Sequence, residues 1–257
     1  MKTIPAPVFP IAAFRRSLLV ALLASSLVAV VRAESNDTRD LIAWLLAGDR
    51  QLANIPFADV ILDATGKRIL PVDPVADKPW LTQLSSALDR TLTALNDPAQ
   101  PIHQAARINE ASRYIEDQLH DELNKIPGWK CTIPLTSSGE EQRSGYPDLR
   151  LALPDGSFVL LDPKLFDPDS RTSTLRTFYY EPRTLTNKIH EDARHLLIGI
   201  RHNGKPGPEL QLLGWELIDV SKLRVQLKAE FQASNKDIYQ NGNTVARSST
   251  PPDEAAP

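Results

Sequence analysis

Cysteine is almost absent from this chain of 257 residues, and its scarcity excludes two classes of protein. Cys131 is the single cysteine, so the chain has no disulfide framework and no cysteine-based metal site. We interpret Cys131 as a small buried hydrophobe on a strand. The sequence also lacks a Gly-x-Ser-x-Gly motif, a glycine-rich phosphate loop and a His-Glu-x-x-His motif. The enzyme classes that these motifs mark are therefore not indicated.

Hydrophobic runs of membrane-spanning length are also lacking. The longest apolar stretch, residues 17–31, has 15 residues, whereas a bilayer span needs about 20. Arg15 and Arg16 precede it, in a weak match to a twin-arginine signal, and Val31-Arg32-Ala33 is typical of a cleavage site. We predict that residues 1–33 are a signal peptide, that the mature chain is secreted or periplasmic, and that it has no membrane contact. An uncleaved membrane anchor is the alternative.

Excess positive charge is missing as well. The formal net charge is −3, and removal of residues 1–33 would change it to −7, because that segment holds four basic residues and no acid. An acidic chain is unsuited to broad non-specific binding of nucleic acid, which depends on neutralising phosphates. A local basic surface remains compatible with this charge, since Lys and Arg outnumber Asp and Glu between residues 164 and 205.

The mature sequence divides into an N-terminal extension, a core and a tail. In the extension, residues 34–100, apolar spacing predicts helices over 37–53 and 79–96, with two short strands around a Thr65-Gly66 turn between them. The tail, residues 241–257, is rich in Pro, Ser and Asn without apolar periodicity, which predicts disorder.

The core, residues 101–240, has the order α-β-β-β-α-β, which predicts an α/β fold with a mixed central sheet flanked by helices. Its clearest feature is a hairpin, because Pro154-Asp155-Gly156 separates two apolar strands. The predicted helices are 102–125, 184–194 and a closing helix at 221–233, and the predicted strands are 128–136, 147–154, 157–166, 195–202 and 210–218.

Two carboxylates and a lysine are placed by this hairpin at one end of the sheet. Asp148 opens the first strand and Asp162 is near the end of its antiparallel partner, so their side chains can converge. Lys164, two residues further on, points to the same face as Asp162. Two carboxylates offer the oxygen ligands that Mg²⁺ prefers, and an ammonium group can stabilise charge on a phosphoryl group. The pattern therefore indicates hydrolysis of a phosphodiester.

The motifs "YPDLRL" and "VLLDPK" resemble those of the PD-(D/E)xK nuclease superfamily. Within it, "SGYPDL", "RTFYYEP", "NKIHEDARHLLI" and "LKAEFQASNKDIY" look like type II restriction endonucleases. The resemblance covers about residues 105–240 and extends toward residue 57. It implies metal-dependent cleavage of double-stranded DNA with Mg²⁺, or Mn²⁺ in its place, and it leaves a homodimer open.

The resemblance also implies roles for individual residues. Asp148 and Asp162 would be metal ligands, Lys164 the catalytic lysine, and Glu116 a third metal ligand from the first core helix. Glu110 is the rival for the last role, and Glu122 is expected nearer the core. Contacts with DNA phosphates would come from three residues in the flanking segments: Arg143, Ser144 and Lys188.

Two departures from the family pattern are compatible with the alternative that the protein is catalytically inactive. Pro163, in the middle of the acid-x-Lys element, removes a backbone donor from a central strand, which indicates a bulge or a site that has lost activity. Export is the second departure, because restriction enzymes work beside a protecting methylase inside the cell. The alternative function is an inactive nuclease-fold binding module of the cell envelope. His190, His195 and His202 lack zinc-site spacing and are expected on the surface.

Overall fold

The computed structural model describes residues 37–46, 53–174, 177–228, 232–240 and 243. One compact unit spans Asn54–Gln226, and the residues on either side of it form a second unit. The described parts of that second unit include helical residues 37–46 and the short helix α5, Asn235–Ile238. The predicted signal peptide lies outside the described residues, as does the predicted tail except for residue 243. Among the described helices, none has both the length and the apolarity needed to cross a membrane.

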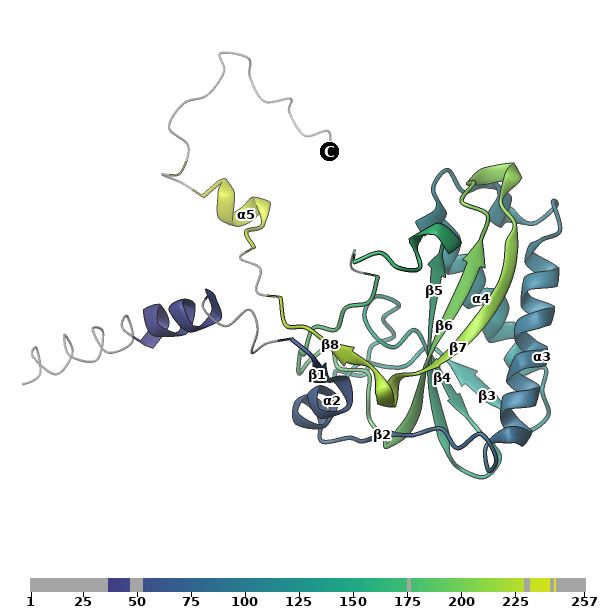
Figure 1. Cartoon of the computed structure of the whole chain (residues 1–257), viewed down its shortest axis with the longest axis horizontal. Coiled ribbons are helices and arrows are strands. Elements are labelled where there is room, and N and C mark those ends of the chain that lie inside the picture. The colour runs from purple at the N-terminus through teal and green to yellow at the C-terminus, as the bar shows by residue number, and fades with distance from the viewer. Residues whose placement is uncertain (1–36, 47–52, 175–176, 229–231, 241–242, 244–257) are drawn as a thin grey trace, which may run out of the picture. The chain divides into compact units, whose positions relative to one another are not determined.

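A mixed six-stranded sheet forms the centre of the compact unit, as the sequence predicts (Figure 1). Strands β2, β6, β5, β4 and β3 follow one another across it, and β7 also pairs with β6. β6 is parallel to β2 and β5, whereas β3–β4, β4–β5 and β6–β7 are antiparallel. The strand bounds are Ile69–Leu70 for β2, Lys130–Thr132 for β3, Leu149–Ala152 for β4, Phe158–Phe166 for β5, Ala193–His202 for β6 and Leu212–Asp219 for β7.

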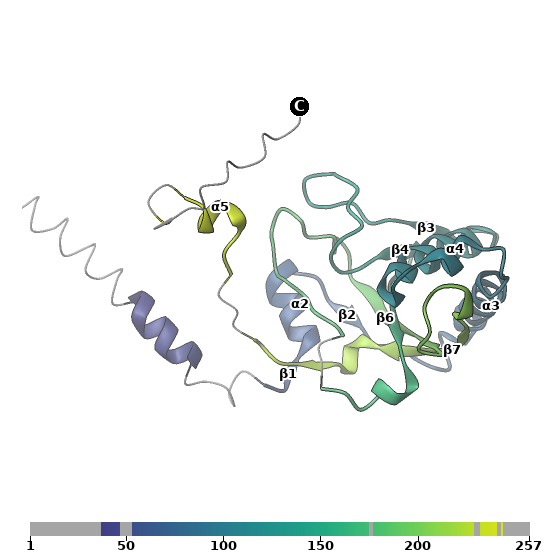
Figure 2. The same cartoon turned by 90° about the horizontal axis from the view of Figure 1, so that it is seen from above.

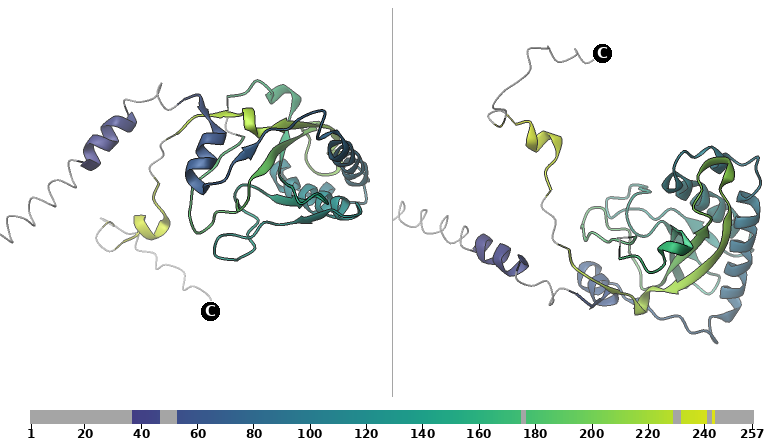
Figure 3. Two further views of the ribbon diagram at one scale, coloured as in Figure 1. Left: turned by 90° about the horizontal axis from the view of Figure 1, so that it is seen from below. Right: turned by 45° about the horizontal axis from the view of Figure 1, so that its top comes forward.

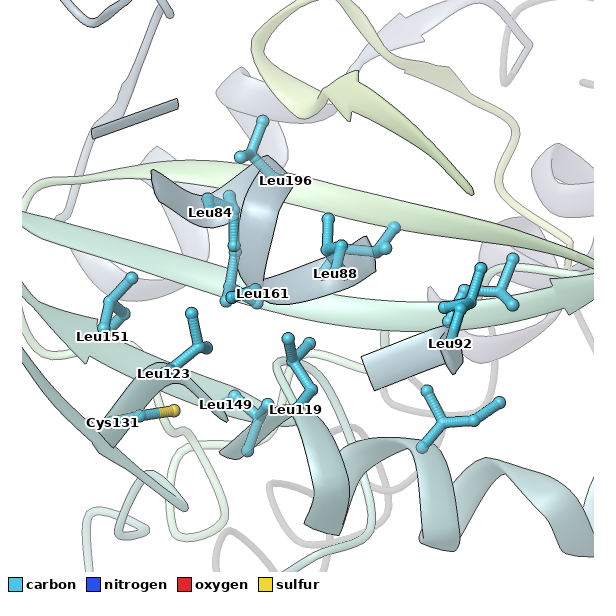
Figure 4. Close-up of a cluster of buried hydrophobic side chains, with 14 of the residues drawn as sticks. Leu84, Leu88, Leu92, Leu119, Leu123, Cys131, Leu149, Leu151, Leu161 and Leu196 are labelled. Carbon is cyan, nitrogen blue, oxygen red and sulfur yellow. The ribbon is translucent and has the colours of Figure 1, made fainter. Parts of the chain in front are cut away.

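Two helices cover one face of this sheet. These helices are α3, Lys78–Leu95, and α4, Ser112–Asn124 (Figure 3). Their leucines point toward the leucines of β4, β5 and β6 (Figure 4). The resulting core is a large cluster of hydrophobic side chains and contains Cys131, which is buried as expected. Its central members are Leu84, Leu88, Leu119, Leu123, Leu149, Leu151, Leu161 and Leu196.

The opposite face of the sheet has a smaller, aromatic core. Phe57, on helix α2 (Phe57–Thr65), contacts the rings of Tyr146, Phe178 and Tyr180 edge to face, with centroids 5.1–5.7 Å apart. Leu160 of β5 belongs to this second cluster, whereas its neighbours Val159 and Leu161 belong to the first. Successive residues of β5 therefore serve the two faces in turn, and α2 lies apart from α3 and α4 (Figure 2).

The two strands predicted around Thr65-Gly66 are wrong in part, since the first of them is helix α2. Phe57 and Ile61 are four residues apart, so they share the buried side of one helical turn. Gly66 adopts φ 69° and its backbone N–H donates to the carbonyl of Leu62, which ends the helix. A glycine is equally suited to a hairpin turn and to this helix end, so the sequence did not distinguish them. The second of the two predicted strands is present as β2.

Three predicted helices are also corrected. The 102–125 helix is α-helical only over α4, because two 3-10 turns, Pro101–Gln104 and Ile108–Ala111, precede it. Residues 184–192 form turns and irregular chain in place of a helix, so β5 and β6 are joined without one. In place of the closing helix the chain forms a 3-10 turn, Val220–Lys222, followed by the short strand β8, Arg224–Val225. β8 pairs with β1, Ile55–Pro56. Residues 229–231 of the predicted helix lie outside the described chain.

We predict that Leu119→Ala lowers the free energy of unfolding by about 2–5 kcal/mol, because Leu119 is fully buried between the sheet and α3. Equilibrium denaturation in urea measures this loss. Leu62→Ala removes the same atoms from α2, where Leu62 is 45% exposed, and should cost no more than about 0.5 kcal/mol. Equal losses in the two variants would contradict the assignment of the core.

Candidate active site

The β4–β5 hairpin brings Asp148 and Asp162 together. Leu149 is paired with Leu161 in the antiparallel register, so the preceding Asp148 lies beside Asp162 at the end of the ladder. Lys164 completes the group, with its Nζ 2.6 Å from Oδ2 of Asp162 and 3.5 Å from Oδ2 of Asp148. The structure thus places side by side the three residues that the sequence predicts to converge.

Pro163 does not disturb this arrangement. The pairing of β5 with β6 runs through Asp162, Pro163 and Lys164 without a register shift, so there is no bulge here. β4 pairs with β5 only as far as Leu161, and Pro163 lies beyond that ladder. A proline is tolerated where one side of a strand has no partner to receive its backbone donor. The departure from the family pattern therefore has a structural explanation that leaves the geometry of the two carboxylates intact.

A cleft of about 940 Å³ opens over these residues. Its wall is built from α4 and the turn before it, the segment leading into β4, the outer half of β5, and Thr177 and Tyr179. Glu116 of α4 lines the cleft together with Asp148, Asp162 and Lys164. The fourth residue implied by the resemblance is thus in the same cavity as the other three. Glu110, its rival, also lines the cleft but pairs with Arg107. Glu122, expected nearer the core, is buried and pairs with Arg90 and Lys125.

Burial gives two of these carboxyl groups an unusual affinity for protons. Desolvation, with the charge of Asp148 added, raises the pKa of Asp162 to about 7, although Lys164 acts in the opposite direction. The same two causes raise the pKa of Glu116 to about 7 against the charges of Arg143 and Lys164. For Lys164, burial favours the neutral form, but the two aspartates outweigh it and raise the pKa. Such shifts are typical of functional sites.

The donor set fits a divalent cation of the magnesium kind. Oδ2 of Asp162 is buried and accepts no hydrogen bond of good geometry, although it is close to the ammonium group of Lys164. Mg²⁺ commonly takes one or two carboxylates and completes its shell with water and phosphate oxygens. Among the described residues, no group of three or more His, Cys, Asp and Glu side chains is gathered closely enough to enclose a metal by itself. The two aspartates are the residues that would hold the ion, with Glu116 as a further candidate.

The three predicted phosphate contacts differ in their surroundings. Arg143 is 42% exposed at the cleft and lies 2.7 Å from Asp117 and 3.8 Å from Glu116. Ser144 is exposed in the cleft wall, where its hydroxyl accepts a hydrogen bond from the amide of Gln142. Lys188 is only 1% exposed, and its ammonium group donates to the carbonyl of Gln142. An exposed phosphate contact was expected of Lys188, and the structure gives it a buried environment.

A buried tyrosine–histidine pair beside the site was missed from the sequence. The hydroxyl of Tyr146 is 2.7 Å from Nδ1 of His195, and both residues are buried. Burial lowers the pKa of His195 to about 3, so its ring is neutral. His195 and His202 are thus interior residues, which corrects the expected surface position, while His190 is exposed. The sequence offered one indication of this burial, because His195 lies two residues before Leu197 and so shares its strand face.

Comparison with known proteins identifies the family of this chain. The model of the type II restriction enzyme MjaV family matches residues 51–242. The type II restriction enzyme MjaV of Methanocaldococcus jannaschii is 30% identical to the chain over 202 residues, which cover 74% of this chain and 86% of that protein. The matched region includes the whole compact unit and all four residues Glu116, Asp148, Asp162 and Lys164. The chain therefore belongs to the type II restriction enzyme MjaV family, a group of restriction-endonuclease-like nucleases.

Proposed function

We propose that the chain is a divalent-metal-dependent endonuclease that hydrolyses phosphodiester bonds in double-stranded DNA. Membership of a type II restriction enzyme family supports a DNA endonuclease. The observation that carries the finer proposal is the convergence of Asp148, Asp162 and Lys164 in one cleft. A cavity of this kind, with a few convergent polar groups of shifted pKa, is the expected form of an active site.

Each residue has a task that its position allows. Asp148 and Asp162 would hold Mg²⁺, or Mn²⁺ in its place, and Glu116 would bind the ion or its water from the facing helix. When bound, the ion supplies a polarised phosphoryl oxygen and a more acidic water molecule. The ammonium group of Lys164 stabilises the negative charge that develops on the phosphoryl oxygens, and it does so in a partly buried position where that charge counts for more. Arg143 and Ser144, which line the cleft, would contact the DNA backbone.

Purified protein should nick plasmid DNA with Mg²⁺ or Mn²⁺ and not with EDTA. Asp162→Asn and Lys164→Met should each lower the cleavage rate by at least about 100-fold, because each removes a group that acts at the reacting phosphate. Glu110→Gln is the matched control, since Glu110 lies at the mouth of the same cleft but pairs with Arg107, and it should stay within about threefold of the wild type. Gel assays of nicked and linear plasmid measure all four proteins.

DNA binding without cleavage by the wild type would support the alternative, a binding module of the same fold. Cleavage that survives Asp162→Asn would place the active site elsewhere.

Cleavage at limiting Mg²⁺ should rise as the pH is raised from about 6 to 8. Burial and the nearby charge of Asp148 raise the pKa of Asp162 and Glu116 to about 7, so below that pH protons compete with the metal for the same carboxylates. Saturating Mg²⁺ should move the midpoint of the profile to lower pH, because metal binding favours the ionised groups. Initial cleavage rates measured from pH 6 to 8 at two Mg²⁺ concentrations test this prediction. A pH midpoint that does not change with the Mg²⁺ concentration would contradict it.

Export is a separate proposal and rests on residues 1–33 alone. The chain recovered from outside the cytoplasm should begin at Glu34, where the predicted signal peptide ends. Intact-mass measurement of the exported protein checks this start. Recovery of the full-length chain from the cytoplasm alone would remove the export proposal and leave the nuclease proposal unaffected.

A further inference from the structure

Lys188 is the most unusual charged residue of the compact unit. Its side chain is 1% exposed, and lysine is almost never fully buried without a partner. Its ammonium group donates a hydrogen bond to a neutral acceptor, the carbonyl oxygen of Gln142, at 3.1 Å. A buried ammonium group with one carbonyl bond is costly unless opposite charges lie nearby. The compensation for Lys188 must therefore come from its surroundings.

Those surroundings are the three carboxylates of the cleft. Burial lowers the pKa of Lys188 overall, and the charges of Asp148, Asp162 and Glu116, in that order of size, offset part of this effect. Lys188 donates to the carbonyl of Gln142, which lies six residues before Asp148 and directly before Arg143, where this segment begins to line the cleft. The next residue, Ile189, packs in the aromatic cluster with Tyr146. Lys188 is thus buried and does not line the cleft, although its charge interacts with the carboxylates there.

The formal charges of the inner site show what this lysine changes. With its three carboxylates ionised and Lys164 and Lys188 charged, the site has a net charge of −1. One divalent cation makes it +1, which matches the single negative charge of a phosphodiester. Without Lys188 the same metal-loaded site would be neutral. The charges around this inner site are more exposed and screened by solvent: Arg143 lies near Asp117 and Glu116, Arg113 near Asp117, and Arg107 near Glu110.

We propose that Lys188 is a positioning residue whose buried positive charge leaves the site, once loaded with one divalent cation, with the surplus charge that draws in a phosphodiester. It does not touch the DNA, and acts through the carboxylates and the Gln142–Asp148 segment. This inference rests on the proposed nuclease function. It accounts for a lysine in the interior, where a purely structural position would be filled at lower cost by an apolar side chain.

Removal of this charge should affect the metal and the DNA in opposite directions. Lys188→Gln keeps a donor for the Gln142 carbonyl but lacks the charge. At pH 8 it should bind Mn²⁺ roughly fivefold more tightly, because a repelling charge has gone, and bind duplex DNA in the presence of Ca²⁺ roughly fivefold more weakly. Titration of the metal-free full chain, with free Mn²⁺ followed by electron paramagnetic resonance, measures the first. Fluorescence anisotropy of labelled DNA measures the second.

If Lys188→Gln damaged the fold, it would weaken the affinity for both Mn²⁺ and DNA, and that result would overturn the proposal. Dissociation constants for Mn²⁺ and DNA that both stay within twofold of the wild type would overturn it too. Lys188→Arg, which keeps the charge, should restore values near the wild type. Lys222→Gln makes the same chemical change at an exposed lysine outside the cleft and should alter neither constant. Asp162→Asn distinguishes a failure of the proposed metal site from a failure of the role proposed for Lys188. If the wild type binds no Mn²⁺ or Asp162→Asn binds it equally well, the proposed metal site fails; if only Lys188→Gln is unchanged, the role of Lys188 fails.

Discussion

The pairing of Leu149 with Leu161 is the constraint on which the rest of the site depends. This register directs Leu149, Leu151, Val159 and Leu161 toward α3 and α4, where they form the main apolar core. Because side chains alternate along a strand, the same register directs Asp148, Asp162 and Lys164 to the other face. A slip of one residue would exchange the two sets, burying charges against the leucines. The packing energy of the core thus fixes the positions of the proposed catalytic groups.

The carboxylates are in turn held among charges of both signs. Lys164 approaches from the same strand, Arg143 from the segment before β4, and Lys188 from the chain before β6. Only Lys164 is in direct contact with both aspartates. The three cations come from three separate segments, so the site needs the complete fold and cannot be reproduced by the hairpin alone.

Local patterns were sufficient to predict the hairpin, the mixed sheet and the convergence of Asp148, Asp162 and Lys164, because each depends on neighbours close in sequence or on strand alternation. Glu116 was expected near the site because the resemblance to the nuclease superfamily implies an acid from the first core helix. The helix expected at 184–194 is absent, since that segment is fixed by contacts distant in sequence, such as the bond from Lys188 to Gln142. The burial of Lys188 and His195 was missed for the same reason, because it is caused by segments from elsewhere in the chain that pack over them.

Burial of the carboxylates has a consequence for the stability of the protein as a whole. A carboxyl group whose pKa is raised by folding favours the folded state while it is protonated, and this contribution disappears as the pH rises from about 4 through 7. A metal ion that binds only the folded, ionised site would restore the lost free energy. The nuclease and its ion would then form one thermodynamic unit, in which the metal is also a part of the fold. Thermal melts at pH 5 and pH 8, with and without Mg²⁺, would show this as a metal-dependent stabilisation confined to the higher pH.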